Sequence, residues 1–299
     1  DVCSSDLGTG YFDSVNNQYC GDVFSFCLPN AEDIHLPKII APNVFAGETT
    51  SGIPIAAGAG DNAGAALGVG AKVGDLVISL GTSGTAFVVS STPTHDLSGE
   101  VAGFADATGN YLPLACTLNA AKIFASTSAM LNLTFDQFSE LALSARSGAD
   151  GLRLLPHFDG ERTPNRPNSR GQLVGINHSN FTRENIARAA IEGVLAGMIY
   201  AATAVSKLGV NWNRVLLIGG AAKNSAVQQI AAKLFGGEVV IPAPGEYVAD
   251  GAAKQAAWAL TGAKELPDWK DSKIETLTAD DSEEDREVVA SYLNLISKI

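Results

Sequence analysis

Three glycine-rich turns each follow a predicted strand and carry residue types that could bind or activate a ligand. The first, residues 58–62 (Gly-Ala-Gly-Asp-Asn), places Asp61 between a strand and the start of a helix. An aspartate there can serve as a general base or meet a metal ion, and it can equally cap the helix. Taken alone, this turn favours the cap.

The second turn, residues 79–84 (Ser-Leu-Gly-Thr-Ser-Gly), lies between two predicted strands that would form a hairpin. Backbone N–H groups and hydroxyls at such a tip suit phosphate oxygens, although an ordinary hairpin turn has the same composition. The third turn, residues 217–225, puts Gly219-Gly220 and small residues before a helix. It leaves room for a flat ligand or makes a tight joint, and it matches neither the Walker A motif nor the GxGxxG fingerprint.

The elements around these turns alternate between strands and helices, which predicts an α/β layer fold. Thr182 is expected to cap a long helix that runs to residue 208. The predicted strands cover residues 52–58 (buried), 75–80, 85–90, 152–156, 214–218 and 238–241. The predicted helices cover residues 61–71, 118–131, 135–146, 182–208, 224–235, 250–260 and 288–296.

The charge balance argues against general nucleic-acid binding, because 32 acidic residues outnumber 20 Lys and Arg, a net charge of −12. Residues 265–299 hold ten acidic and four basic residues and are expected to form a solvated acidic tail. The four cysteines and four histidines show no metal-ligand spacing, so no metal site is expected and the thiols are expected to be reduced. Neither a signal peptide nor an apolar run of about 18 residues is evident, so no membrane partner is expected.

The order and spacing of the motifs resemble those of the FGGY family of carbohydrate kinases, most closely its xylulokinase members. The resemblance runs from about residue 8 to about residue 262. The matching segments are residues 58–62, 79–84, 160–164 (Gly-Glu-Arg-Thr-Pro), Glu192-Gly193, and Gly219-Gly220-Ala221 with Asn224.

The resemblance implies an α/β protein with the ribonuclease-H-like fold of actin and the sugar kinases, in which two domains face a cleft. It implies transfer of the γ-phosphoryl group of ATP, with Mg²⁺, to a sugar hydroxyl. Asp61 would be the catalytic base, and Asp61 and Asn62 would bind the sugar. Asn62 favours a ketopentose, D-xylulose first, which would yield D-xylulose 5-phosphate. The residues that would bind ATP are Gly81, Thr82, Ser83, Gly84, Gly219, Gly220, Ala221 and Asn224.

Two alternatives stay open at this point. Another FGGY kinase would act on L-ribulose, gluconate or glycerol, whereas a non-catalytic actin-like module would bind nucleotide and transfer nothing. A cytoplasmic protein whose partners are sugar and ATP, without nucleic acid or membrane, is expected, and a homodimer is compatible with the resemblance.

The first domain is short in comparison with the family. We expect residues 1–72 to be the end of a sugar-binding domain, residues 73–264 a nucleotide-binding domain, and residues 265–299 the acidic tail. Residues 1–7 match nothing in the family and are expected to be a cloning or sequencing scar. The chain is therefore expected to be an incomplete C-terminal part that can be inactive alone.

Overall fold

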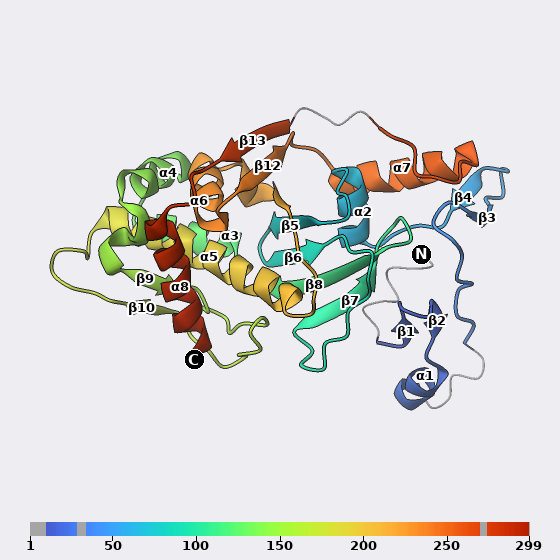
Figure 1. Ribbon diagram of the computed structural model, residues 1–299, viewed down its shortest axis with the longest axis horizontal. Coiled ribbons are helices and arrows are strands. Elements are labelled where there is room, and N and C mark those ends of the chain that lie inside the picture. The colour runs from blue at the N-terminus through green and yellow to red at the C-terminus, as the bar shows by residue number, and fades with distance from the viewer. Residues whose placement is uncertain (1–9, 29–33, 270–273, 299) are drawn as a thin grey trace.

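A seven-stranded mixed sheet forms the centre of the computed structural model, which describes residues 10–28, 34–269 and 274–298 (Figure 1). Its order is β13-β12-β11-β5-β6-β8-β7. Strands β5, β11 and β12 are parallel, and the remaining pairs are antiparallel, which confirms the α/β class. The suspected scar at residues 1–7 lies outside the described residues. The strands are β5 (Asp75–Leu80), β6 (Gly84–Val88), β7 (Val101–Ala105), β8 (Tyr111–Thr117), β11 (Arg214–Ile218), β12 (Glu238–Pro242) and β13 (Ile274–Thr278).

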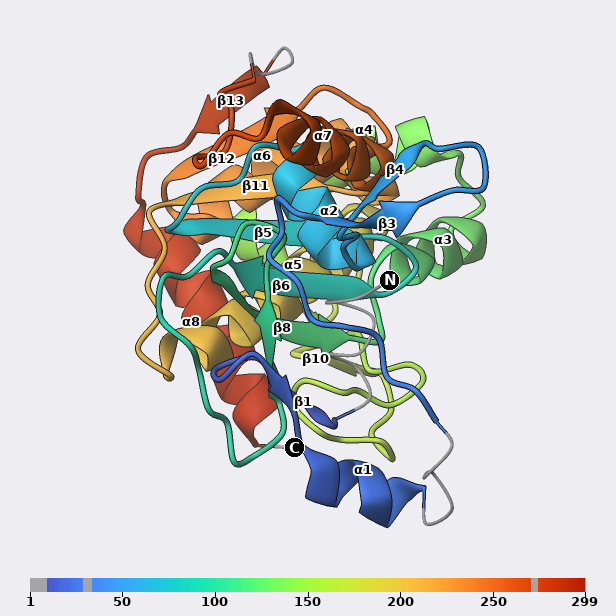
Figure 2. The same cartoon turned by 90° about the vertical axis from the view of Figure 1, so that its right-hand side faces the viewer.

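Helices cover both faces of this sheet (Figure 2). Leu76, Ile78 and Leu80 of β5 join the core on the α5 face, while Val77 joins the core beneath α2. A strand that is buried on both faces is apolar throughout, which explains why β5 was predictable. Helices α2 (Asp61–Gly68) and α7 (Tyr247–Thr261) lie on one face. The other face carries α3 (Ala121–Met130), α4 (Phe135–Ser144), α5 (Arg183–Ser206), α6 (Ser225–Phe235) and α8 (Glu283–Ser297).

Helices α2 and α7 cross with their backbones in contact. A Cβ atom built on Gly251 of α7 would lie 1.9 Å from the carbonyl oxygen of Gly64 on α2. Lys254 of α7 donates through Nζ to the carbonyl oxygen of Gly68 at 2.8 Å and so binds the last turn of α2. The two helices therefore hold each other in a fixed position.

The long helix α5 runs through the core. Thr182 caps it as predicted, because its side chain accepts a hydrogen bond from the backbone N–H of Asn185. By length and composition α5 could span a membrane, so the expectation that no apolar run is this long was wrong. An apolar stretch of 18 residues within it is 78% buried inside the structure, as in the core helix of a globular protein.

The acid-rich C-terminal segment is not a solvated extension. Strand β13 pairs with β12 at the edge of the sheet, and helix α8 packs on the core. Ser282 caps α8, and Val288, Tyr292 and Ile296, spaced four residues apart, are its buried apolar side chains. The acidic residues mostly occupy the other faces of this segment. Its net charge therefore gave no indication of the apolar side chains that it buries.

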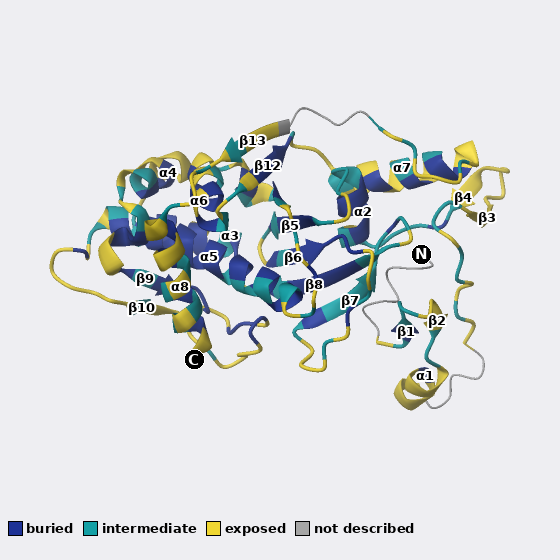
Figure 3. Ribbon diagram, viewed as in Figure 1, coloured by how far each residue is buried: buried dark blue, intermediate teal, exposed yellow. Residues whose placement is uncertain are grey.

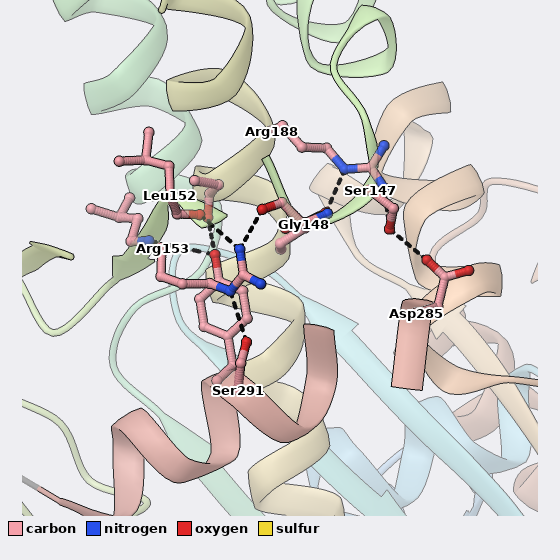
Figure 4. A network of polar contacts seen from close by, with 11 residues as sticks. Ser147, Gly148, Leu152, Arg153, Arg188, Asp285 and Ser291 are labelled. Atoms are coloured by element: carbon pink, nitrogen blue, oxygen red, sulfur yellow. Dashed lines mark hydrogen bonds and ion pairs between the residues drawn. The ribbon is translucent and has the colours of Figure 1, made fainter. Parts of the chain in front are cut away.

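Polar contacts attach α8 to the loop η3 (Ser147–Gly151) and the strand after it (Figure 4). Arg153 donates through Nε to Ser291 Oγ at 2.8 Å, and its guanidinium lies 5.2 Å from the ring centroid of Tyr292. The hydroxyl of Ser147 donates to Asp285 Oδ1 at 2.5 Å. Helix α8 is thus bonded to the domain through specific side chains as well as apolar contact.

A buried ion pair on α5 adjoins this attachment. Arg188 Nε lies 2.6 Å from Glu192 Oε1, and both side chains are almost fully buried. Burial raises the pKa of Glu192, and Arg188 opposes that effect. The sequence resemblance had marked Glu192, and the structure gives it a place in the core rather than in a ligand site.

The first described residues lie outside the main sheet and are largely exposed (Figure 3). The predicted buried strand at residues 52–58 is the exposed strand β4, because it pairs only with β3 and Ile55 is 46% exposed. The elements here are β1 (Phe12–Asp13), β2 (Gln18–Tyr19), α1 (Gly21–Cys27), β3 (Phe45–Glu48) and β4 (Pro54–Ala56). A further pair, β9 (Arg153–Leu155) and β10 (Gln172–Val174), lies near α5.

Candidate active site

Asp61 is the first residue of α2, and its carboxylate is exposed. The cap of this helix is Gly60, so the interpretation of Asp61 as the cap was wrong. Asp61 Oδ1 accepts hydrogen bonds from the backbone N–H of Asn62 at 2.8 Å and from Asn62 Nδ2 at 3.0 Å. Its other oxygen, Oδ2, makes no hydrogen bond among the described residues. One oxygen is therefore fixed by its neighbour while the other is available to a ligand.

Asn62 links this turn to the hairpin of β5 and β6. Its Oδ1 accepts a hydrogen bond from Thr85 Oγ1 of β6 at 3.4 Å. The first and second turns, which the sequence places more than 20 residues apart, are therefore neighbours in space.

The tip of the hairpin is held from behind by the start of α3. The backbone N–H groups of Ala120 and Ala121 donate to the carbonyl oxygens of Thr82 and Gly81 at 3.3 and 2.9 Å. The hydroxyls of Thr82 and Ser83 are exposed and make no hydrogen bond among the described residues. A fixed backbone that presents two free hydroxyls can bind an anion such as a phosphate.

The third turn lies directly against the strand that leads into this hairpin. Strands β11 and β5 are in parallel register, with Ile218 opposite Ser79. Gly219 has φ 95° and ψ 173°, and a Cβ atom on it would lie 2.6 Å from the carbonyl oxygen of Leu80. A Cβ atom on Gly220, by contrast, would meet nothing within 4 Å. Gly219 makes the close approach possible, and Gly220 leaves open space beside it.

A cleft of about 720 Å³ opens at the carboxyl ends of the parallel strands, where α/β folds commonly bind ligands. Ser79, Gly219 and Gly220 line it. Its opposite wall, residues 242–248, was not predicted from the sequence, although a Pro-Ala-Pro-Gly run at the end of a strand could have marked it.

Asn224 lies at the start of α6. It caps α6, because its Oδ1 accepts from the backbone N–H of Ala226 and Val227, and its Nδ2 lies 2.5 Å from Ser139 Oγ. It lines a separate, smaller cavity of about 400 Å³ beside α4, and Lys223 lines both cavities. Ala221 and residues 81–84 line neither of the two cavities.

The segment 160–164 supports the hairpin through a buried carboxylate. Glu161 Oε1 accepts hydrogen bonds from the backbone N–H of Leu118 at 2.5 Å, and Oε2 accepts from Asn119 Nδ2 at 3.0 Å. Burial raises the pKa of Glu161, and these hydrogen bonds oppose the rise. Leu118 and Asn119 directly precede Ala120 and Ala121, which hold the hairpin tip. The segment 160–164 therefore helps to fix the position of the hairpin tip, residues 81–84.

His157, just before this segment, yields a prediction about pH. Burial lowers the pKa of His157 from its ordinary 6.5 to about 4, with a smaller contribution from Arg166. The unfolded chain therefore binds the proton first, and folding stability falls as the pH drops from 6.5 toward 4. We expect this to remove about 2 kcal/mol between pH 7 and pH 5. Urea unfolding of wild type and His157→Gln at both pH values measures it, and an equal loss in both proteins would contradict a buried neutral imidazole.

A metal site would need several His, Cys, Asp or Glu side chains to lie together among the described residues. No group of three His, Cys, Asp or Glu side chains there could hold a metal ion. The described cysteines, Cys20, Cys27 and Cys116, are free thiols.

The comparisons with known proteins agree with this arrangement of motifs. A sequence model described as the FGGY family of carbohydrate kinases, C-terminal domain, matches residues 76–260. The chain belongs to the FGGY family of carbohydrate kinases. The sheet, the hairpin and the Gly219 turn all fall within or next to the matched part of this FGGY chain.

The relatives of the FGGY chain include xylulose kinases and a gluconokinase. The xylulose kinase of Streptomyces coelicolor is 40% identical over 264 residues, 85% of this chain and 53% of that protein. A gluconokinase of Bacillus subtilis is 28% identical over 237 residues, 74% of this chain and 44% of that protein. The crystal structure of xylulose kinase from Bifidobacterium adolescentis superposes with a TM-score of 0.89 at 40% identity, covering 99% of this chain and 62% of that one. The actin-like ATPase fold of the sugar kinases is thereby confirmed, and the chain spans about half the length of the curated relatives it matches.

Proposed function

We propose that the protein containing this chain is an ATP-dependent sugar kinase that phosphorylates a ketopentose, D-xylulose first. The observation that carries the proposal is the contact between its motifs. Asn62 bonds to Thr85 at 3.4 Å, the hairpin lies against Gly219, and Glu161 holds the residues behind the hairpin tip. The 40% identity to a xylulose kinase favours the ketopentose.

Asp61 would act as the general base. In the transfer, the sugar hydroxyl oxygen forms a bond to the γ-phosphorus while the bond from that phosphorus to ADP breaks, and the electron pair leaves with ADP. The hydroxyl proton goes to Asp61 Oδ2, the oxygen without a partner. Asn62, by holding Oδ1 through two hydrogen bonds, orients that base. The half-buried amide of Asn62 lies next to it and would contact the sugar.

The nucleotide would lie across the hairpin and the cleft. The hydroxyls of Thr82 and Ser83 would meet its phosphates, and the open space beside Gly220 would receive the adenosine. Mg²⁺ favours phosphate oxygens, water and one or two carboxylates, and here it would be held mainly by the phosphate oxygens of the nucleotide and by water. Bound there with the nucleotide, Mg²⁺ would neutralise phosphate charge. The matching Asn224 would act only indirectly, by fixing the start of α6.

The domain assignment belongs to the same proposal. Residues 1–72 would contribute to a sugar-binding domain, and residues 73–264, with the packed segment 274–298, would form the nucleotide-binding domain. The β3–β4 region supports this division, because Phe45, Ile53 and Ile55 are 41%, 61% and 46% exposed, and exposed apolar side chains that gather in one region are commonly covered by further chain. A cytoplasmic location and a homodimer are part of the proposal, to be tested by cell fractionation and by sedimentation.

A substrate panel tests the choice of sugar. ADP release from Mg·ATP is measured on the gene product that contains these residues, with D-xylulose, L-ribulose, gluconate and glycerol. We expect D-xylulose to give the highest kcat/KM. The 28% identity to a gluconokinase makes gluconate the specific second candidate, and a preference for gluconate would replace the ketopentose assignment. Nucleotide binding that no sugar turns into ADP release would indicate a non-catalytic module.

A further inference from the structure

The segment 160–164 holds one exposed cation in an otherwise buried frame. Glu161 and Thr163 are 4% and 1% exposed, and Pro164 is buried, whereas Arg162 between them is exposed. Gly160 has φ 78°, and a Cβ atom on it would lie 2.3 Å from the carbonyl oxygen of Pro167. The backbone of this segment is therefore fixed on both sides, and the guanidinium is the side chain that it presents to solvent.

The backbone of Arg162 is linked through Glu161 and strand β8 to the turn that carries Asp61. The backbone N–H of Arg162 donates to Glu161 Oε1 at 2.8 Å, and the same oxygen accepts from the N–H of Leu118 at 2.5 Å. Two residues before Leu118, Cys116 of β8 is the register partner of Thr85, the residue that bonds to Asn62. One shared oxygen and one strand pair thus connect Arg162 to the active-site turn.

The charges of Arg162 and Asp61 both affect the pKa of the Cys116 thiol. Burial raises the pKa of Cys116, Arg162 lowers it, and Asp61 raises it. The Arg162 guanidinium and the Asp61 carboxylate are therefore both within electrostatic reach of this half-buried thiol.

Arg162 differs from the other cations of this region because its guanidinium has no hydrogen bond or ion pair among the described residues. Lys122 is paired with Asp159 at 2.7 Å. The guanidinium of Arg166 donates to the Asn165 carbonyl oxygen, and that of Arg170 to the Ser169 carbonyl oxygen. A guanidinium presents a planar set of donors that fits two phosphate oxygens at once.

We propose that Arg162 binds the phosphoryl group being transferred, through hydrogen bonds to its non-bridging oxygens. The proposal rests on the proposed sugar-kinase function, and it assigns a residue to the γ-phosphate side of that site. Arg162 forms and breaks no covalent bond: the proton still moves to Asp61 and the electron pair still leaves with ADP. A cation here offsets the charge that spreads over the γ-phosphoryl oxygens. In this role Arg162 would contribute to the binding of ATP but not to that of ADP, because only ATP carries the γ-phosphoryl group.

The test compares nucleotide affinities of the full chain by titration calorimetry. The ligands are Mg·ADP and the Mg complex of the β,γ-imido analogue of ATP, and the variants are Arg162→Gln, Arg162→Lys and the matched control Arg170→Gln. We expect Arg162→Gln to weaken the ATP analogue about tenfold and to leave ADP within about twofold. Arg162→Lys should lose less affinity for the ATP analogue, because lysine keeps the positive charge although it lacks the planar pair of guanidinium donors. Arg170→Gln should match wild type for both ligands.

A second measurement tests the placement without any nucleotide. In a chain with Cys3, Cys20 and Cys27 replaced by serine, iodoacetamide alkylates Cys116 alone. We expect Arg162→Gln to slow this alkylation, because the thiolate loses a neighbouring cation, and Asp61→Asn to speed it. Unchanged rates in Arg162→Gln would overturn the placement of the guanidinium beside the turn.

The outcomes separate this proposal from the proposed function. If wild type binds both nucleotides and Arg162→Gln binds them equally well, the role of Arg162 is overturned and the nucleotide site stands. If Arg162→Gln weakens ADP and the ATP analogue alike, the assignment to the γ-phosphoryl group is overturned. If folded wild type binds neither ligand, the proposed function fails, and the role of Arg162 fails with it.

Discussion

Asparagine in place of Asp61 is expected to lower sugar-dependent ADP release by about 10²–10⁴-fold, the usual contribution of a general base. Asparagine keeps the Oδ1 atom that accepts two hydrogen bonds from Asn62, so the turn should keep its shape. It replaces the free oxygen, Oδ2, with an amide nitrogen that cannot accept the proton. The effect should fall on kcat, while Mg·ADP affinity stays within about twofold. Steady-state ADP release on the gene product that contains these residues, with calorimetry alongside, measures both.

Asp159 supplies a matched control for this variant. Its carboxylate is exposed and paired with Lys122 at 2.7 Å, so Asp159→Asn removes a similar charge from the same region. An exposed pair of this kind contributes little, and turnover close to wild type is expected. If Asp61→Asn keeps more than a tenth of wild-type turnover, Asp61 is not the base. Equal losses in the two variants would indicate a general effect of charge.

Alanine at Gly219 is expected to lower the free energy of unfolding by about 3 kcal/mol or more. The backbone there, at φ 95° and ψ 173°, is in a region that glycine almost alone adopts. The added Cβ atom would also lie within 2.6–2.8 Å of three backbone atoms of Leu80, which cannot move without displacing the hairpin. Urea unfolding monitored by circular dichroism gives the change. Nucleotide binding should fall with it, since the turn and hairpin separate.

Gly220→Ala is the control for that variant. It lies one residue along the same turn, and its Cβ atom would meet nothing within 4 Å. We expect its unfolding midpoint to lie near that of wild type. A similar loss of stability in both variants would show that the cost comes from the general mobility of this turn rather than from contact with Leu80.

Much of the sheet could be predicted from the sequence because its central strands are apolar on both faces. The predicted bounds of β5 and β11, and the cap at Thr182, agree with the structure. The predicted hairpin and the helix after Asp61 are also present. Local patterns suffice for such elements, since the periodicity and the turn residues point to the same answer.

Other features depend on contacts between distant residues and could not be predicted. The sequence showed ten acidic residues in segment 265–299, whereas the burial of Tyr292 depends on where α8 meets Arg153 of another element. The place of Glu161 under the hairpin likewise depends on Leu118, 43 residues away. Asn224 fitted the family pattern, but its amide is engaged in a helix cap and a bond to Ser139. In each case the partner residue lies on another element, and a single sequence does not show which elements are in contact.

The most direct test of the account is Mg·ADP binding to the folded chain and to Gly220→Leu. The side chain of leucine would project from Gly220 into the cleft, where nothing lies within 4 Å of the first added atom, so the fold should be preserved. We expect saturable one-to-one binding by wild type and Gly220→Ala, and an affinity lowered at least about 100-fold in Gly220→Leu at an unchanged unfolding midpoint. Binding that Gly220→Leu leaves intact, or no binding by folded wild type, would contradict a nucleotide site in this cleft.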